Sequence, residues 1–330
     1  MTPSLYRETL KRAFAITRSH TYLWFFGFLA AFLGNGGEYE FVLNQFNAIS
    51  SGRWGVSASL ISLFGSGGTN IITFFADVAR MLPSGSTVVL GGLSFILIML
   101  AWVVISSQGA LMRAVAHVSE GRRIALFEHF TAGTRSFWHL FGILAATRIG
   151  ALLILLVVGA PLAALLMYVI EPLAALLLVL FVVGIPLFVV VSLIGKYAIA
   201  FRMIDNEPWD VSIQRALKLF ADHWLVSLEL ALLLFAVNIV AGAVIVLFVF
   251  AVSMPFAILG NVLAELGSMI AGSIILQVGR VFGYAFLLVL GSALATFQYA
   301  CWTELFLKIS KKHHLSKLLR VVTGWREKYR

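Results

Sequence analysis

Seven histidines, at positions 20, 117, 129, 139, 223, 313 and 314, are the side chains best suited to metal binding or acid–base chemistry. No two of them have the HExxH spacing, which places two zinc ligands and a general base on one helix face. All seven lie in segments, or at segment edges, that the charge pattern assigns to the cytoplasmic side. We therefore expect solvated histidines rather than a metal site, and no cofactor.

Three acidic residues, Asp205, Glu207 and Asp210, cluster just before a long apolar run. Negative charge is favoured at a helix start, and so we expect Asp210 or Ser212 to cap the next helix. The sequence GSGGTN at 65–70 lacks the lysine of a phosphate-binding loop and is expected to form a turn.

Other catalytic signals are weak. Cys301 is the only cysteine, which excludes an intrachain disulfide and a cysteine-based metal site. No serine–histidine–acid or paired-carboxylate pattern stands out, and so we expect no enzyme activity.

Ionisable residues at the edges of apolar runs are the stronger signal, because a charge at the centre of a spanning helix costs about 3 kcal/mol and tends to face a partner or a polar cavity. Arg148 precedes the apolar run that starts at Ala151, and Glu229 directly precedes the run that starts at Leu230. They form an intramembrane pair, line a polar cavity together with Asn238, or do not meet; the sequence leaves all three open. Asn238, Gln277 and Gln298 are also candidates for interhelical hydrogen bonds.

The elements that must position these residues are membrane helices. The 330 residues are 61% hydrophobic and 12% charged, with a mean hydropathy of +0.97, which a soluble domain could not keep off its surface. Runs long enough to cross about 30 Å of hydrocarbon predict six spans. They are roughly 20–34, 87–106, 149–170, 173–195, 224–252 and 281–301.

The basic residues give these spans an orientation. With the N-terminus inside, all of the 24 Lys and Arg except Arg53, Arg80 and Arg280 fall on the cytoplasmic side, as the positive-inside rule requires. The pattern predicts both termini in the cytoplasm. The net charge of +9 is spread between apolar runs rather than gathered on a soluble module, and so no nucleic acid partner is expected.

The predicted fold is all-α, with the six helices paired as three hairpins that enter from amphipathic cytoplasmic segments. Residues 1–310 form one transmembrane domain, with an outer loop at 35–86 that contains an interfacial helix. A true threefold repeat and a chance likeness between helices entering from one side both stay open. In the first amphipathic segment, Tyr6, Leu10, Ala13, Phe14 and Thr17 are expected to share the apolar face.

Anionic lipid is the expected partner at the cytoplasmic face, because each basic residue near an anionic surface contributes about 1 kcal/mol of attraction. Residues 311–330 form a basic amphipathic tail. The candidate headgroup contacts are Arg7, Lys11, Arg18, Lys311, Lys312, Lys317 and Arg320.

Around the fourth and fifth spans, the segment GKYAIAFRMIDNEPWDVSIQRALKLFADHWLVSLELALLLF at 195–235 resembles a family of prokaryotic polytopic membrane proteins of unknown function. This family is related to the membrane domain of glycerophosphodiester phosphodiesterases. Tyr197, Asp205, Ala216 and Trp224 occupy the family's tyrosine, acidic turn, central alanine and membrane-entry aromatic, and ATFQYACWTEL is similar to its closing helix. The resemblance covers about half the chain and implies a location in the cytoplasmic membrane of a prokaryote. No segment resembles the phosphodiesterase catalytic domain, and so the resemblance implies no catalysis.

Two functional classes follow from the sequence. The first is a non-catalytic scaffold, accessory subunit or biogenesis component that engages lipid, a membrane protein partner or a second copy of itself. The second is a transporter or lipid-handling protein with a cavity between the hairpins. The spans lack central carboxylates that could relay protons, which favours the first.

Overall fold

The computed structural model of the protein describes residues 5–31, 87–122, 126–166 and 178–311. Within these ranges all regular structure is helical, and no strand occurs. The predictions for the outer loop at 35–86 and for most of the tail at 311–330 lie outside the described residues. The predicted all-α class is confirmed for the part of the chain that is described.

The described chain begins with two short helices, α1 (Leu5–Ser19) and α2 (Leu23–Ala31). The basic residues Arg7, Lys11 and Arg18 are exposed on α1, whereas Tyr6, Ala13 and Thr17 are buried. Phe14 was expected on the same face as these three, but it is 60% exposed. Leu5, Thr9 and Ile16 complete the buried stripe, which turns Phe14 away from the packed side.

The middle of the chain forms α6 (Thr87–Ser119), α7 (Leu126–Arg135) and α8 (Phe137–Ile154). A π-helical turn, η1 (Leu155–Gly159), joins α8 to α9 (Ala160–Leu166). A second one, η2 (Leu180–Gly184), leads into α11 (Ile185–Ile204), which has a proline in its first turn, where the missing N–H costs nothing. The predicted third span starts at 149, but the apolar helix already begins at Phe137.

The turn between α11 and α12 (Trp209–Glu265) depends on two residues. Asn206 has a φ of 58°, a left-handed conformation that asparagine tolerates, and Pro208 takes the N-cap position of α12 without a side-chain hydrogen bond. The prediction that Asp210 or Ser212 caps this helix is therefore wrong, because proline fixes the start earlier. Asp210 still lies in the first turn, where its negative charge interacts favourably with the helix dipole.

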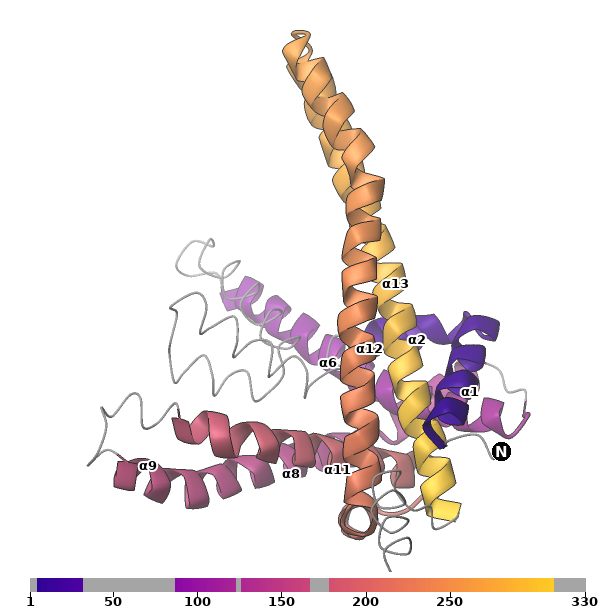
Figure 1. Ribbon diagram of the computed structural model, residues 1–330, viewed down its shortest axis with the longest axis vertical. Coiled ribbons are helices and arrows are strands. Elements are labelled where there is room, and N and C mark those ends of the chain that lie inside the picture. Colours follow the sequence, from indigo (N-terminus) through magenta and orange to yellow (C-terminus); the bar gives the residue numbers. More distant parts are fainter. Residues whose placement is uncertain (1–4, 32–86, 123–125, 167–177, 312–330) are drawn as a thin grey trace, which may run out of the picture.

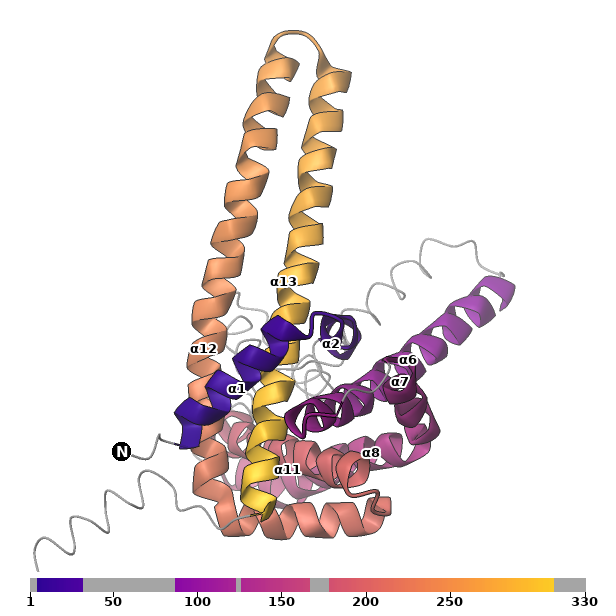
Figure 2. The same cartoon turned by 90° about the vertical axis from the view of Figure 1, so that its right-hand side faces the viewer.

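The last two helices, α12 and α13 (Met269–Lys311), form a long hairpin. α12 has 57 residues, of which the 42 after His223 form the long arm, about 63 Å in length. His223 has non-helical angles (φ −130°, ψ 27°) and kinks the helix where the amphipathic segment was predicted to enter the membrane. The hairpin projects far beyond the other helices. These helices lie beside its lower half and cross it at large angles (Figures 1 and 2).

Small residues bring the two arms of this hairpin close together. A Cβ on Gly279 would lie 2.5 Å from Phe256 Cβ, and one on Gly283 would lie 2.7 Å from Ser253 Oγ. The GxxxG pair at 279 and 283 is thus a close-packing face. Gln298 Nε2 also donates a hydrogen bond to Asn238 Oδ1 at 2.5 Å, which confirms the predicted interhelical contact of these two residues.

The core lies where the lower half of the hairpin meets the other helices. Its largest fully buried side chains include Tyr197, Phe26, Phe188 and Phe306. Away from this core the helices diverge, and large apolar side chains between Ile239 and Val289 are exposed on the hairpin. A surface of this kind suits lipid or another membrane protein rather than water.

Five helical stretches in the described residues are long and apolar enough to cross a membrane. They are Ser94–Ser119, Phe137–Leu166, Val182–Ile204, Trp209–Glu265 and Met269–Ser310. These are the properties of a multi-pass membrane protein. They correspond to the predicted second to sixth spans. Of the predicted first span at 20–34, the structure describes residues 20–31, which include α2.

Candidate functional site

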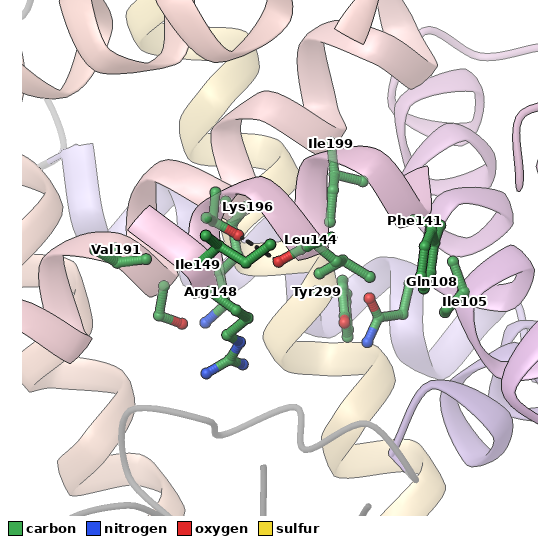
Figure 3. Close-up of a pocket in the computed structure, with 14 residues that line it drawn as sticks. Ile105, Gln108, Phe141, Leu144, Arg148, Ile149, Val191, Lys196, Ile199 and Tyr299 are labelled. Atoms are coloured by element: carbon green, nitrogen blue, oxygen red, sulfur yellow. Dashed lines mark hydrogen bonds between the residues drawn. The ribbon is translucent and has the colours of Figure 1, made fainter. Parts of the chain in front are cut away.

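A pocket of about 370 Å³ lies among α6, α8, α11 and α13 (Figure 3). It is lined by Ile105, Gln108, Phe141, Leu144, Ala145, Thr147, Arg148, Ile149, Val191, Ser192, Gly195, Lys196, Ile199 and Tyr299. Arg148 and Lys196 supply two positive charges, and no Asp or Glu is among the described residues that line it. We call this the basic pocket.

Helical spacing explains why these side chains meet. On α8, Phe141, Leu144 and Arg148 recur every three or four residues, and Ser192, Lys196 and Ile199 do the same on α11. Each set therefore occupies one helix face. A Cβ at Gly195 would lie 3.7 Å from Thr147 Oγ1, in ordinary contact, and so α8 and α11 are close neighbours here without requiring a glycine.

Aromatic rings fix the position of both cations. The guanidinium carbon of Arg148 lies 4.7 Å from the centroid of the Phe188 ring, and Lys196 Nζ lies 4.8 Å from that of Trp302. Both rings are buried, and so these contacts hold the charges in a partly apolar setting, where cation–π attraction is strongest. The charges are thereby directed at one cavity from two neighbouring helices.

Neutral donors complete the polar part of the basic pocket. Gln108 of α6 and Tyr299 of α13 are each 5% exposed and contribute an amide and a hydroxyl. Figure 3 shows the polar ends of Arg148, Gln108 and Tyr299 on the same side of the pocket. Cationic and neutral donors around a cavity with apolar walls form a binding site for an anion that carries an apolar group.

The three predicted intramembrane residues are placed differently. Arg148 lines the basic pocket, but Glu229 and Asn238 are not among the described residues that line it. The Glu229 carboxylate accepts a hydrogen bond from the Tyr6 hydroxyl of α1, and Asn238 bonds Gln298. None of these contacts joins Arg148 to Glu229, and so their pairing stays a prediction.

The candidate lipid contacts at the predicted cytoplasmic face are only partly described. Arg7, Lys11 and Arg18 lie on the exposed side of α1, and Lys311 is the last residue of α13. Lys312, Lys317 and Arg320 lie outside the described residues. Contact of any of them with lipid stays a prediction.

Several of the candidate histidines and acidic residues contact other side chains in the structure. The rings of His117 and His129 lie 5.3 Å apart between α6 and α7, and in the described part of the chain no three His, Cys, Asp or Glu side chains gather as metal ligands. Glu207 forms an ion pair with Arg215, and its carbonyl accepts a hydrogen bond of 2.9 Å from Arg202. These contacts fix the turn before α12.

Burial, together with the nearby charges of His117 and Arg113, lowers the pKa of His129 to about 4. His129 is therefore neutral at pH 7.

Sequence reasoning missed Lys196, Gln108 and Tyr299 as members of a site. Lys196 had a signal of its own, since it is the only charged residue between Ile185 and Phe201 of α11. An ionisable residue within an apolar helix is a functional candidate by default. Gln108 and Tyr299 gave no such signal, because only the packing of α6 and α13 brings them to Arg148.

Comparisons of the chain with protein-family models, curated proteins and solved structures found no match. The resemblance to the membrane domain of glycerophosphodiester phosphodiesterases therefore stays a prediction, and the chemistry of the basic pocket carries the functional argument.

Proposed function

We propose that this chain is a non-catalytic component of a prokaryotic cytoplasmic membrane that holds an anionic phospholipid in the basic pocket. It acts as a scaffold, accessory subunit or biogenesis factor with six spans and both termini inside. The presence of Arg148 and Lys196 in one pocket with apolar walls carries this proposal. A phospholipid offers the matching combination of a negative headgroup and an apolar chain.

Position in the fold supports a lipid over a soluble anion. The side chains of Phe141 and Ile149 line the pocket and are 46% and 55% exposed, respectively, so that apolar surface continues from the pocket outward. In a membrane this surface faces lipid tails, and a bound lipid could keep its chains there while its headgroup reaches the cations.

Lipid retention tests the proposal. The purified protein is extracted from native membranes in mild detergent, and retained lipids are identified by native mass spectrometry. We expect anionic phospholipid on the wild type and a loss of several-fold in Arg148→Gln and in Lys196→Gln, because each removes one of two charges. Arg280→Gln is the matched control, since Arg280 is an exposed arginine near the far end of the hairpin. Equal retention by all four proteins would remove the basis of the proposal.

A lipid-handling or transport role is the second candidate, and the location of the basic pocket between helices of different hairpins favours it. Reconstitution into vesicles with fluorescent anionic lipid in one leaflet separates the two roles. Accelerated exchange between leaflets that depends on Arg148 supports transport, whereas tight retention without exchange supports the scaffold.

A further inference from the structure

Gln108 is a buried polar side chain in the wall of the basic pocket (Figure 3). It is 5% exposed, and in the described part of the chain its amide forms no hydrogen bond. Its neighbour Ser107, in contrast, bonds the Val103 carbonyl of the same helix at 2.7 Å. A buried amide without a partner is costly, and native proteins pair nearly all of them. The hydrogen-bonding capacity of Gln108 is therefore available to a group that enters the pocket.

The amide of a glutamine both donates and accepts hydrogen bonds. Nε2 carries two hydrogens, and Oε1 has two lone pairs. The free oxygens of a phosphodiester only accept and an ammonium group only donates, and so either group alone leaves part of the amide unpaired. A hydroxyl does both, and two neighbouring hydroxyls can pair with Nε2 and Oε1 together.

We infer that Gln108 makes the basic pocket select a lipid headgroup that carries hydroxyl groups besides its phosphate, the class of phosphatidylglycerol. This inference rests on the proposed function, which assigns the pocket to an anionic phospholipid, and it concerns the part of the headgroup beyond the phosphate. A headgroup of the same size without hydroxyls would place carbon against the Gln108 amide and exclude water from it. Such a ligand binds less tightly, because it cannot replace the hydrogen bonds that the amide loses.

A soluble polyol phosphate such as glycerol 3-phosphate carries the same hydroxyl and phosphate groups as the lipid. The apolar residues Phe141 and Ile149 of the pocket, which are 46% and 55% exposed, favour the lipid, because a soluble ligand would gain nothing from them. The binding experiment therefore includes glycerol 3-phosphate as a competitor.

Binding is measured on the full chain in nanodiscs of phosphatidylcholine that carry a small fraction of a fluorescent test lipid. The test lipids are phosphatidylglycerol and phosphatidylpropanol. Both are phosphodiesters with the same charge and a headgroup chain of equal length, and they differ only in the hydroxyls of that chain. We expect phosphatidylglycerol to bind the wild type about tenfold more tightly than phosphatidylpropanol.

Two variants of α6 assign this preference to one side chain. Gln108→Met keeps the length of the side chain but removes the amide, and it should reduce the ratio toward one by weakening phosphatidylglycerol. Ser107→Ala is the matched control and should keep the ratio, since Ser107 is a buried polar residue that is not among the described residues lining the pocket. Without lipid, Gln108→Met should unfold at no lower temperature than the wild type, because an apolar side chain replaces an unpaired amide.

The outcomes separate the inference from the proposed function. Equal affinity of the wild type for both lipids, with both weakened in Arg148→Gln, overturns the hydroxyl preference and leaves the proposed function standing. A tenfold ratio that persists in Gln108→Met, or that is lost equally in Ser107→Ala, overturns the assignment to Gln108. Absence of saturable binding of either lipid by the wild type overturns the inference and the proposed function together. Complete displacement of phosphatidylglycerol by millimolar glycerol 3-phosphate overturns the lipid as the ligand. Since the two headgroups are compared on the wild type, the comparison is decisive even if a variant fails to fold.

Discussion

The Tyr6 hydroxyl donates a hydrogen bond to the Glu229 carboxylate, and this bond joins the first helix to α12 across 223 positions of sequence. The helix α1 is also held by α13, where Lys308 Nζ lies 3.3 Å from Thr9 Oγ1 and 3.4 Å from a carboxylate oxygen of Glu8. The amphipathic first helix is thus attached to both arms of the hairpin near its base. Glu229 has a structural role in this attachment.

Replacement of Tyr6 by Phe should destabilise the protein. It removes a hydrogen bond to a carboxylate that is half-buried, at a cost of about 1–3 kcal/mol. Thermal unfolding in detergent checks this, with Tyr284→Phe as the control, because Tyr284 is 67% exposed on α13.

A double-mutant cycle of Tyr6→Phe and Glu229→Gln assigns the effect to this pair. We expect the double variant to be less destabilised than the sum of the two single variants, by about 1 kcal/mol. Additive losses would show that the two side chains act independently.

Substitution of Gly27 by Ala should loosen the contact between α2 and α13. A Cβ at this position would lie 2.5 Å from the Ser292 carbonyl oxygen, and backbone cannot move aside cheaply. Overpacking of this kind costs about 1–3 kcal/mol. Gly242→Ala is the control, since nothing lies within 4 Å of a Cβ there. If Gly27→Ala and Gly242→Ala both unfolded at the same temperature as the wild type, the predicted overpacking at Gly27 would be wrong.

Gly195→Leu should fill the basic pocket without changing its charge. A Cβ at Gly195 makes only ordinary contacts with Thr147, at 3.7 and 3.8 Å, and so the backbone tolerates a side chain that then enters the cavity. We expect several-fold lower lipid retention by native mass spectrometry. The matched control is Gly150→Leu on α8, where no atom lies within 4 Å of a Cβ. Unchanged retention in Gly195→Leu would mean that lipid is held elsewhere.

Acid should weaken the attachment of α7 to α6. The pKa of His129 is lowered to about 4 in the folded protein and is near 6.5 in the unfolded chain. Between these values the unfolded chain binds more protons, and so the stability that neutral His129 contributes is lost as pH falls from about 6.5 toward 4.

Hydrogen exchange of the α7 amides, corrected for the intrinsic pH dependence, measures this loss. Exchange should accelerate between pH 7 and pH 5 in the wild type and change less in His129→Gln. The same acceleration in both proteins would assign the effect to other groups.

The fold class could be predicted from the sequence alone, because the hydropathy and charge of each segment determine whether that segment forms a membrane helix. The start of the fifth span at 224 followed from the apolar run, whereas the kink at His223 just before it did not. The length of α12 did not follow either, because an apolar run shows where a helix is stable in lipid but not where it stops. The helix continues to Glu265 by packing against α13.

The site was harder to predict than the fold. Arg148 could be singled out because charge beside an apolar run is costly. Its expected companions were Glu229 and Asn238, but Lys196, Gln108 and Tyr299 share its pocket. These three come from three other helices, and their convergence depends on crossing geometry that one-dimensional spacing does not contain.

The most direct test of the account is to map where an anionic lipid touches the protein. A phosphatidylglycerol analogue with a photoreactive group close to its headgroup is incorporated into nanodiscs with the full chain, irradiated, and its adducts are located by peptide mass spectrometry. The account predicts adducts on the α8 and α11 peptides that contain Leu144, Ile149 and Val191, and their loss in the Arg148→Gln, Lys196→Gln double variant. Adducts confined to the exposed surface of α12 and α13, or equally abundant in the double variant, would contradict it.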